Sequence, residues 1–143
     1  MLIVKKFGGS SVADREKILN VAKRCAKEYQ EGHDVIVVLS AMGDTTDKLI
    51  SMAREVNPEG SRRELDMLLT TGEQVSVSLM AMALQSLQVP AISLNAFQVR
   101  MHATSRYGNA RFKKVDSERI RHELESRKVV IVTGFQGINK YDD

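Results

Sequence analysis

The stretch LIVKKFGGSSV, residues 2–12, decides the fold. Its first six residues, 2–7, form a short and mostly apolar run that is typical of a buried β-strand. Two glycines follow directly, and Asp14 then offers an N-cap for a helix. A strand, a glycine turn and a helix in this order predict that the chain opens with a strand-to-helix unit.

The rest of the chain repeats this alternation. A helix is expected from Asp14 to about Glu31 and is ended by Gly32; its apolar stripe consists of Ile18, Ala22, Cys25 and Tyr29. Further strands are expected at 35–39, 91–94 and 129–135, and further helices at 45–56, 62–88 and 116–128. Gly72 predicts two helices, or a bend, within 62–88. Residues 95–115 fit short antiparallel strands, for example at 110–115.

This alternation favours an α/β fold with a mainly parallel sheet flanked by helices. The segment 35–39 is nearly all β-branched, which predicts a central strand covered on both faces. In such sheets ligands bind beyond the carboxyl ends of the strands. The loops 8–12, 40–44 and 134–139 each follow a predicted strand and are rich in Gly, Ser or Thr. They are the first places to look for a site.

Composition limits the function classes. A hydrophobic fraction of 43% and a charged fraction of 27% over 143 residues indicate a globular domain large enough for a core. Residues 100–128 carry nine Lys/Arg against four Asp/Glu, but only Tyr107 and Phe112 could stack on bases, which argues against a nucleic-acid partner. Three histidines without ligand spacing and the single Cys25 argue against a metal site built by the protein.

The cellular location is predicted from three further features. The charges at the start of the chain follow a very short apolar run, which is the wrong order for a secretory signal. No membrane span is expected, because no run of 18 apolar residues is present. Cys25 has no partner for an internal disulfide and fits a buried structural thiol. We therefore expect a cytoplasmic protein.

The first loop has the chemistry of a phosphate cradle. Gly8 and Gly9 free the backbone, so that several N–H groups can point at one anion, and the following helix adds its positive N-terminal potential. Lys6 supplies a full charge beside them. The sequence is not a Walker loop, and a simple turn remains the alternative for two glycines after a strand.

The second and third candidate segments each have a structural alternative. In the loop after residue 39, Ser40 and Thr46 offer hydroxyl groups, but Thr45 or Thr46 could simply cap the next helix. Glu73 is placed at the start of the apolar helix 75–87, where a carboxylate could cap the helix dipole. Its functional alternative is recognition of an ammonium group.

Taken together, these segments resemble one family. KFGGSSV (6–12), VLSAMGDTTD (38–47) and ELDMLLTTGEQ (64–74) closely resemble the aspartokinases, as do YGNAR (107–111) and VTGFQG (132–137). The resemblance covers essentially the whole chain, in order and at family spacing. Residues 97–102 depart from the family pattern.

The resemblance implies a fold and a reaction. The fold is the amino-acid kinase fold, a three-layer α/β/α sandwich, here truncated. The reaction is ATP-dependent phosphorylation of the side-chain carboxylate of L-aspartate, towards lysine, threonine and methionine. By resemblance, Lys6, Phe7, Gly8 and Gly9 contact the ATP phosphates, Lys6 is catalytic, and Mg²⁺ is held mainly by the phosphates. Ser40, Thr46 and Glu73 line the aspartate site. A homo-oligomer is expected separately, because the helix 75–87 is apolar nearly all round and must be buried in a core or against a partner.

The family continues beyond these motifs with an Arg-Gly-Gly-Ser-Asp sequence, a nucleotide-binding half and regulatory domains. Residues 1–143 are therefore expected to be the N-terminal lobe of an amino-acid kinase domain, inactive alone. Two alternatives stay open at this point. One is another amino-acid kinase of the same fold, and the other is a non-catalytic binding or assembly module.

Overall fold

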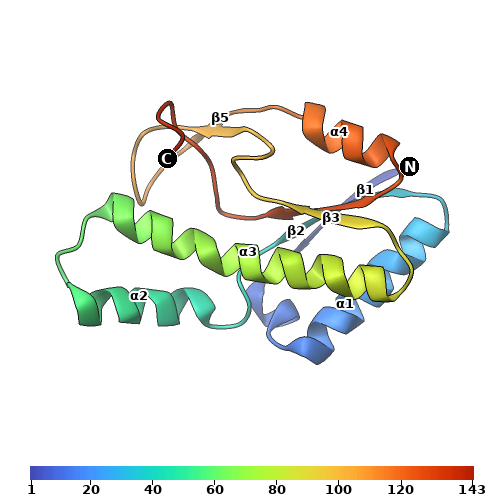
Figure 1. The fold of residues 1–143 in the computed structure, drawn as a ribbon, viewed down its shortest axis with the longest axis horizontal. Helices are drawn as coiled ribbons and strands as arrows, with labels where there is room; N and C mark the ends of the chain where they lie inside the picture. Colours follow the sequence, from blue (N-terminus) through green and yellow to red (C-terminus); the bar gives the residue numbers. More distant parts are fainter.

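A four-stranded parallel sheet forms the centre of the molecule, for which a computed structural model describes residues 1–143 (Figure 1). The strands, in their order across the sheet, are β1 (Leu2–Phe7), β2 (Asp34–Leu39), β6 (Val129–Thr133) and β3 (Ala91–Leu94). All three pairings are parallel, and β2 and β6 occupy the centre. The predicted central position of the second strand is confirmed.

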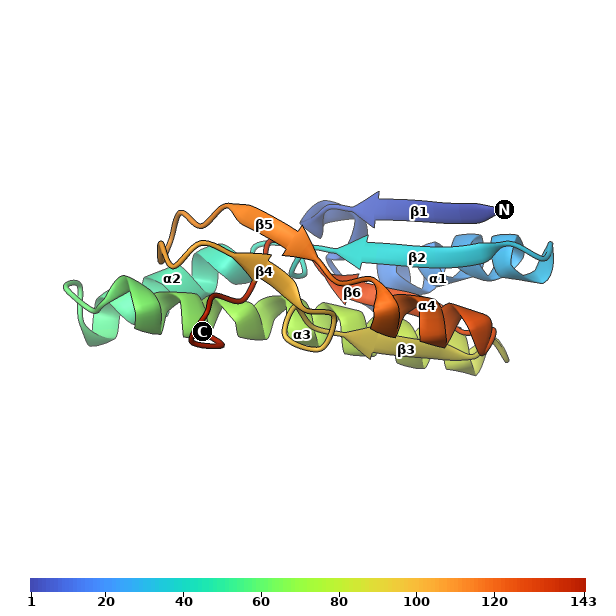
Figure 2. The same ribbon diagram turned by 90° about the horizontal axis from the view of Figure 1, so that it is seen from above.

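Helices cover both faces of this sheet. They are the short 3₁₀ helix η1 (Gly9–Val12) and the α-helices α1 (Arg15–Gln30), α2 (Thr45–Val56), α3 (Arg62–Ser86) and α4 (Glu118–Glu125). In Figure 1, α1 and α3 lie below the sheet and α4 lies above it, while α2 packs beside α3. Figure 2 shows α1 and α3 running along the strands. The predicted three-layer α/β/α sandwich with a mainly parallel sheet is confirmed.

Two hydrophobic clusters match the two faces. The larger one joins α1 and α3 to the sheet and includes Cys25, Leu39 and Met80, all fully buried. The smaller one lies under α4 and includes Val130 and Val132. The expectation that the second strand is covered on both faces was wrong in part. Only every second side chain of β2 is fully buried, because α4 packs over β6 and leaves the other face of β2 half-buried.

Helix α3 corrects another expectation. It is one uninterrupted helix of 25 residues, and Gly72 neither divides nor ends it. A Cβ built on Gly72 would lie 3.0 Å from the Cβ of Ala41, so this glycine lets α3 approach the loop after β2. By length and mean hydropathy alone α3 could cross a membrane, although no membrane span was expected from the sequence. The core helix of a soluble protein passes the same test, and 44% of its most apolar window is buried here.

The helix ends and the hairpin follow the local sequence signals. The Asp14 side chain accepts a hydrogen bond from the Lys17 backbone N–H at 2.8 Å and caps α1, and Gly32 follows the helix with a left-handed φ of +94°. Residues 95–115 contain the antiparallel strands β4 (Met101–Ala103) and β5 (Phe112–Val115), as expected. Strand β6 ends at Thr133, two residues earlier than predicted, because Phe135 turns into the left-handed region with φ +58°.

Candidate active site

The three loops singled out by the sequence meet at one edge of the sheet. Because β1, β2 and β6 are parallel, the segments that follow them leave the sheet at the same edge. Backbone hydrogen bonds join them: Gly43 N–H donates to the Gly9 carbonyl at 2.9 Å, and Gly134 N–H donates to the Leu39 carbonyl at 2.8 Å. The loops therefore form a single structural unit.

Gly9 is the residue on which this contact depends. A Cβ at position 9 would lie 2.8 Å from the Ala41 carbonyl oxygen and 2.9 Å from that of Gly43, closer than any side chain tolerates. A Cβ at Gly8 would meet nothing within 4 Å, and the φ of Gly8 is an ordinary −77°. Of the two glycines in the motif, only Gly9 is required for the two loops to touch.

A cavity of about 660 Å³ opens beside these loops. Its walls contain four of the residues that the sequence assigned to a site: Gly9, Ser40, Thr46 and Glu73. Lys6, Phe7 and Gly8 do not line it. The predicted aspartate-site residues thus lie together, whereas most of the predicted phosphate-site residues lie outside this cavity.

Glu73 is the buried charge of the site. It lies in the middle of α3, so the alternative that it caps a helix was wrong. Its side chain is 7% exposed, and its Oε2 accepts a hydrogen bond from Gln136 Nε2 at 3.1 Å. Glu73 takes part in none of the ion pairs. Burial raises the pKa of Glu73 above its ordinary value, and hydrogen bonds, including that from Gln136, oppose the rise.

The hydroxyl groups that follow β2 have two different roles: one bonds to the protein backbone, and the others line the cavity. Neither threonine caps α2: the N-cap position is Asp44, and Thr45 Oγ1 instead donates back to the Met42 carbonyl. The side chains of Ser40 and Thr46 line the cavity and form no hydrogen bond within the protein. Ser76 on α3 donates to the backbone carbonyl of Ser40 at 2.8 Å, which ties the loop to the helix.

Lys6 lies at the end of β1, close to the loop after β6. Its Nζ is 4.9 Å from the centre of the Phe135 ring, a cation–π contact, and that ring is 82% exposed. A left-handed φ is unfavourable for an aromatic residue, so Phe135 stores backbone strain at the site. The side chain of Phe7 packs against the core, so only its backbone is left for the predicted phosphate contact.

Several lining residues were not predicted. Asp66 and Thr70 come from α3, and Asn109 and Ala110 come from the loop between β4 and β5. The N–H of Gly108 donates to Asp66 Oδ2 at 2.8 Å and fixes that loop as one wall of the cavity. Their motifs were recognised in the sequence, but no local pattern indicates that the hairpin loop turns towards α3.

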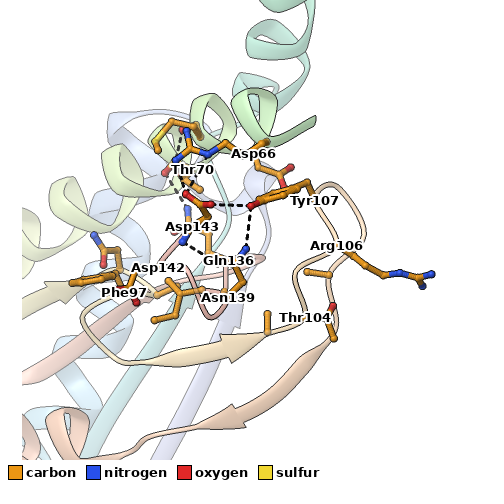
Figure 3. Close-up of a pocket in the computed structure, with 18 of the residues that line it drawn as sticks. Asp66, Thr70, Phe97, Thr104, Arg106, Tyr107, Gln136, Asn139, Asp142 and Asp143 are labelled. Atoms are coloured by element: carbon orange, nitrogen blue, oxygen red, sulfur yellow. Dashed lines mark hydrogen bonds and ion pairs between the residues drawn. The ribbon is translucent and has the colours of Figure 1, made fainter. Parts of the chain in front are cut away.

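Gln136 is the other residue that the sequence analysis missed. It lies in a loop singled out as a candidate site, but it received no role there. Gln136 lines this cavity and also a smaller one of about 300 Å³, which Figure 3 shows. In the smaller cavity Tyr107 OH donates to Asp143 Oδ2 at 2.8 Å, and Asp143 also pairs with Arg63.

This fold and site define a class of protein. The chain matches the Amino acid kinase family over residues 1–143 and belongs to that family. No group of three or more His, Cys, Asp or Glu side chains is placed to hold a metal ion.

Within the family, the similar relatives are aspartokinases. The aspartokinase of Bacillus sp. (strain MGA3) is 48% identical over 99% of this chain and 34% of the relative, and that of Corynebacterium glutamicum is 50% identical over 97% and 33%. The chain thus spans about a third of the length of these curated relatives. The resemblance stated from the motifs is confirmed.

Solved structures agree. Aspartate kinase from Synechocystis is 47% identical, with a TM-score of 0.80 over 96% of this chain and 22% of that chain. E. coli aspartokinase III in complex with aspartate and ADP has a TM-score of 0.85 over 99% of this chain and 42% of that chain. Its identity is 21%, so it supports the fold alone.

Proposed function

We propose that this chain forms the aspartate-binding part of an aspartate kinase. The complete protein transfers the γ-phosphoryl group of ATP to the side-chain carboxylate of L-aspartate and releases 4-phospho-L-aspartate, the first step towards lysine, threonine and methionine. The proposal includes a cytoplasmic location and a homo-oligomer. It is supported by the similarity to aspartokinases over nearly the whole chain.

The observation that carries the proposal is the burial of the Glu73 carboxylate without a cationic partner. A carboxylate that is 7% exposed, has no cationic partner and lines a cavity is costly for the folded protein. Such a group is stabilised when a cation enters and donates hydrogen bonds to it. The α-ammonium group of an amino acid is a cation of this kind, and the hydroxyls of Ser40 and Thr46 in the same cavity suit its carboxylate.

The first loop, residues 8–12, together with Lys6 is proposed to bind the phosphates of ATP. The Gly9 backbone and the Lys6 ammonium group are proposed to stabilise the phosphates of ATP, with Mg²⁺ arriving as part of the MgATP substrate. The aspartate carboxyl has an ordinary pKa of about 3.9 and is ionised at neutral pH, so no general base is needed. What remains is to bring two anions together and to neutralise charge as the phosphoryl group moves.

Steady-state kinetics on the complete natural protein that contains this chain tests the function. Wild type should release ADP in the presence of L-aspartate. Glu73→Gln should raise KM for aspartate at least about tenfold, because it removes the partner of the substrate ammonium, and should leave KM for ATP within about twofold. Lys6→Ala should lower kcat instead. Absence of aspartate-dependent ADP release in the wild type would refute the proposal.

A further inference from the structure

One amide group connects the loop after β6 to α3. The Gln136 side chain is buried, and its Nε2 donates to two acceptors on the helix: the Thr70 carbonyl at 3.0 Å and Glu73 Oε2 at 3.1 Å. The two residues of the pair with Glu73 are 63 positions apart in the sequence. Both hydrogens of the amide are used, so the orientation of the Gln136 side chain is fixed from both sides.

The two oxygens of the Glu73 carboxylate differ. Oε2 accepts the hydrogen bond from Gln136, whereas no other residue donates to Oε1. Oε1 is also not sealed in the interior, since the buried side-chain oxygens without a partner belong only to Glu28 and Thr133. One oxygen of the carboxylate is therefore fixed, and the other is available at the cavity.

The chemistry of the donor matters as much as its position. An arginine or lysine at position 136 would neutralise Glu73 and compete with any cationic ligand. A neutral amide donates a hydrogen bond that favours the ionised carboxylate but leaves its full negative charge in place. The arrangement suits a carboxylate that is charged and correctly oriented before a cationic ligand binds.

We propose that Gln136 is a positioning residue for substrate recognition: it holds Glu73 Oε2 so that Oε1 points into the cavity and accepts a hydrogen bond from the ammonium group of the amino-acid substrate. This inference rests on the proposed function and adds a residue to it. Gln136 acts through Glu73 and does not itself take part in phosphoryl transfer.

A double-mutant cycle on the complete natural protein tests the inference. Gln136→Met keeps a side chain of similar length but removes the donor. It should raise KM for aspartate about tenfold, the usual range for a lost hydrogen bond to a charged group, with kcat and KM for ATP within about twofold. In the Glu73→Gln background the same change should raise KM for aspartate by less than about twofold, because the partner is already gone.

Two further variants keep the experiment decisive. Gln136→Asn retains an amide that is too short to reach α3, and it replaces Gln136→Met if that variant does not fold. Gln85→Met removes a glutamine bond to the Ala91 carbonyl elsewhere on α3 and should leave the kinetics unchanged. Equal effects of Gln136→Met in both backgrounds, or an unchanged KM for aspartate, would overturn the inference alone. A wild type without aspartate kinase activity would overturn the proposed function as well.

Discussion

At the scale of single residues, Glu73 should cost the folded protein stability. Its pKa is raised in the folded state, so the folded protein keeps this proton to a higher pH than the unfolded chain does. Stability is therefore lost as the pH rises from about 4.3, the ordinary value for Glu, through the raised pKa, and it stays lower above that range. Glu73→Gln should melt at a higher temperature than wild type at pH 7–8.

The same variant should lose this advantage in acid. Below about pH 4 the carboxyl is protonated in both the folded and the unfolded states, so the melting temperatures of Glu73→Gln and wild type should converge. Thermal denaturation from pH 3 to pH 8 measures the difference in melting temperature. A Glu73→Gln variant that is less stable than wild type at pH 8 would contradict this account of the residue.

The two glycines of the first loop give a second residue-scale prediction. Gly9→Ala forces a Cβ against the carbonyls of Ala41 and Gly43 and should destabilise the protein by about 1–3 kcal/mol, as overpacking does. Gly8→Ala meets open space and should change the free energy of unfolding by less than about 0.5 kcal/mol. Urea denaturation of both variants compares them directly. Equal losses would show that the loop relaxes around Gly9.

At the scale of elements, the sequence predicts most of the fold because local signals and packing agree. The Asp14 cap, Gly32 and the apolar run of β6 each act locally, and each prediction from them is confirmed within about two residues. Gly72 is different. Its reason for being glycine is Ala41, 31 positions earlier in the chain, and the rule that glycine interrupts a helix does not include such a contact.

The candidate site is likewise predicted where local motifs indicate it, and missed where it depends on contacts between distant segments. Ser40, Thr46 and Glu73 converge as the motifs indicated, since parallel strands deliver their following loops to one edge. The role of Glu73 as a helix cap was wrong because the start of α3 is set by Ser61, whose side chain accepts from the Glu64 N–H. Gln136 was missed because its partner depends on the packing of the loop after β6 onto α3.

The outer face of α3 carries the element-scale prediction. Val75, Leu79 and Met82 lie at helical spacing and are 51%, 39% and 61% exposed, so they form an apolar stripe on the surface. We expect a second copy of the chain to bind there. Leu79→Glu should shift sedimentation at high micromolar concentration towards the monomer, whereas Val56→Glu, at an exposed position on α2, should not. A wild type that is monomeric under these conditions would contradict the prediction.

At the scale of the whole molecule, residues 1–143 combine the cavity proposed to bind aspartate with an open edge of the sheet. The cavity has walls from α3, the loop after β2 and the hairpin loop, all within this chain. Strand β1 is an edge strand, and its side chains Leu2 and Val4 are more than half exposed. Lys6 at its end lines neither of the two main cavities. Within these residues the proposed aspartate site therefore lies in a cavity, whereas most of the proposed phosphate site lies outside it.

This difference between the two proposed sites leads to a prediction for residues 1–143 produced alone. They should bind L-aspartate in a calorimetric titration, and Glu73→Gln should weaken that binding. They should not release ADP from ATP in an aspartate-dependent way, because transfer requires the γ-phosphoryl group to be held in line with the acceptor. The aspartokinase relatives are about three times as long, which leaves room for residues that hold the nucleotide. The control is Lys6→Ala, which removes the one charge proposed to act on the phosphates. Aspartate-dependent ADP release clearly above this control would mean that β1 and its loop position ATP without help, and it would assign both halves of the reaction to residues 1–143.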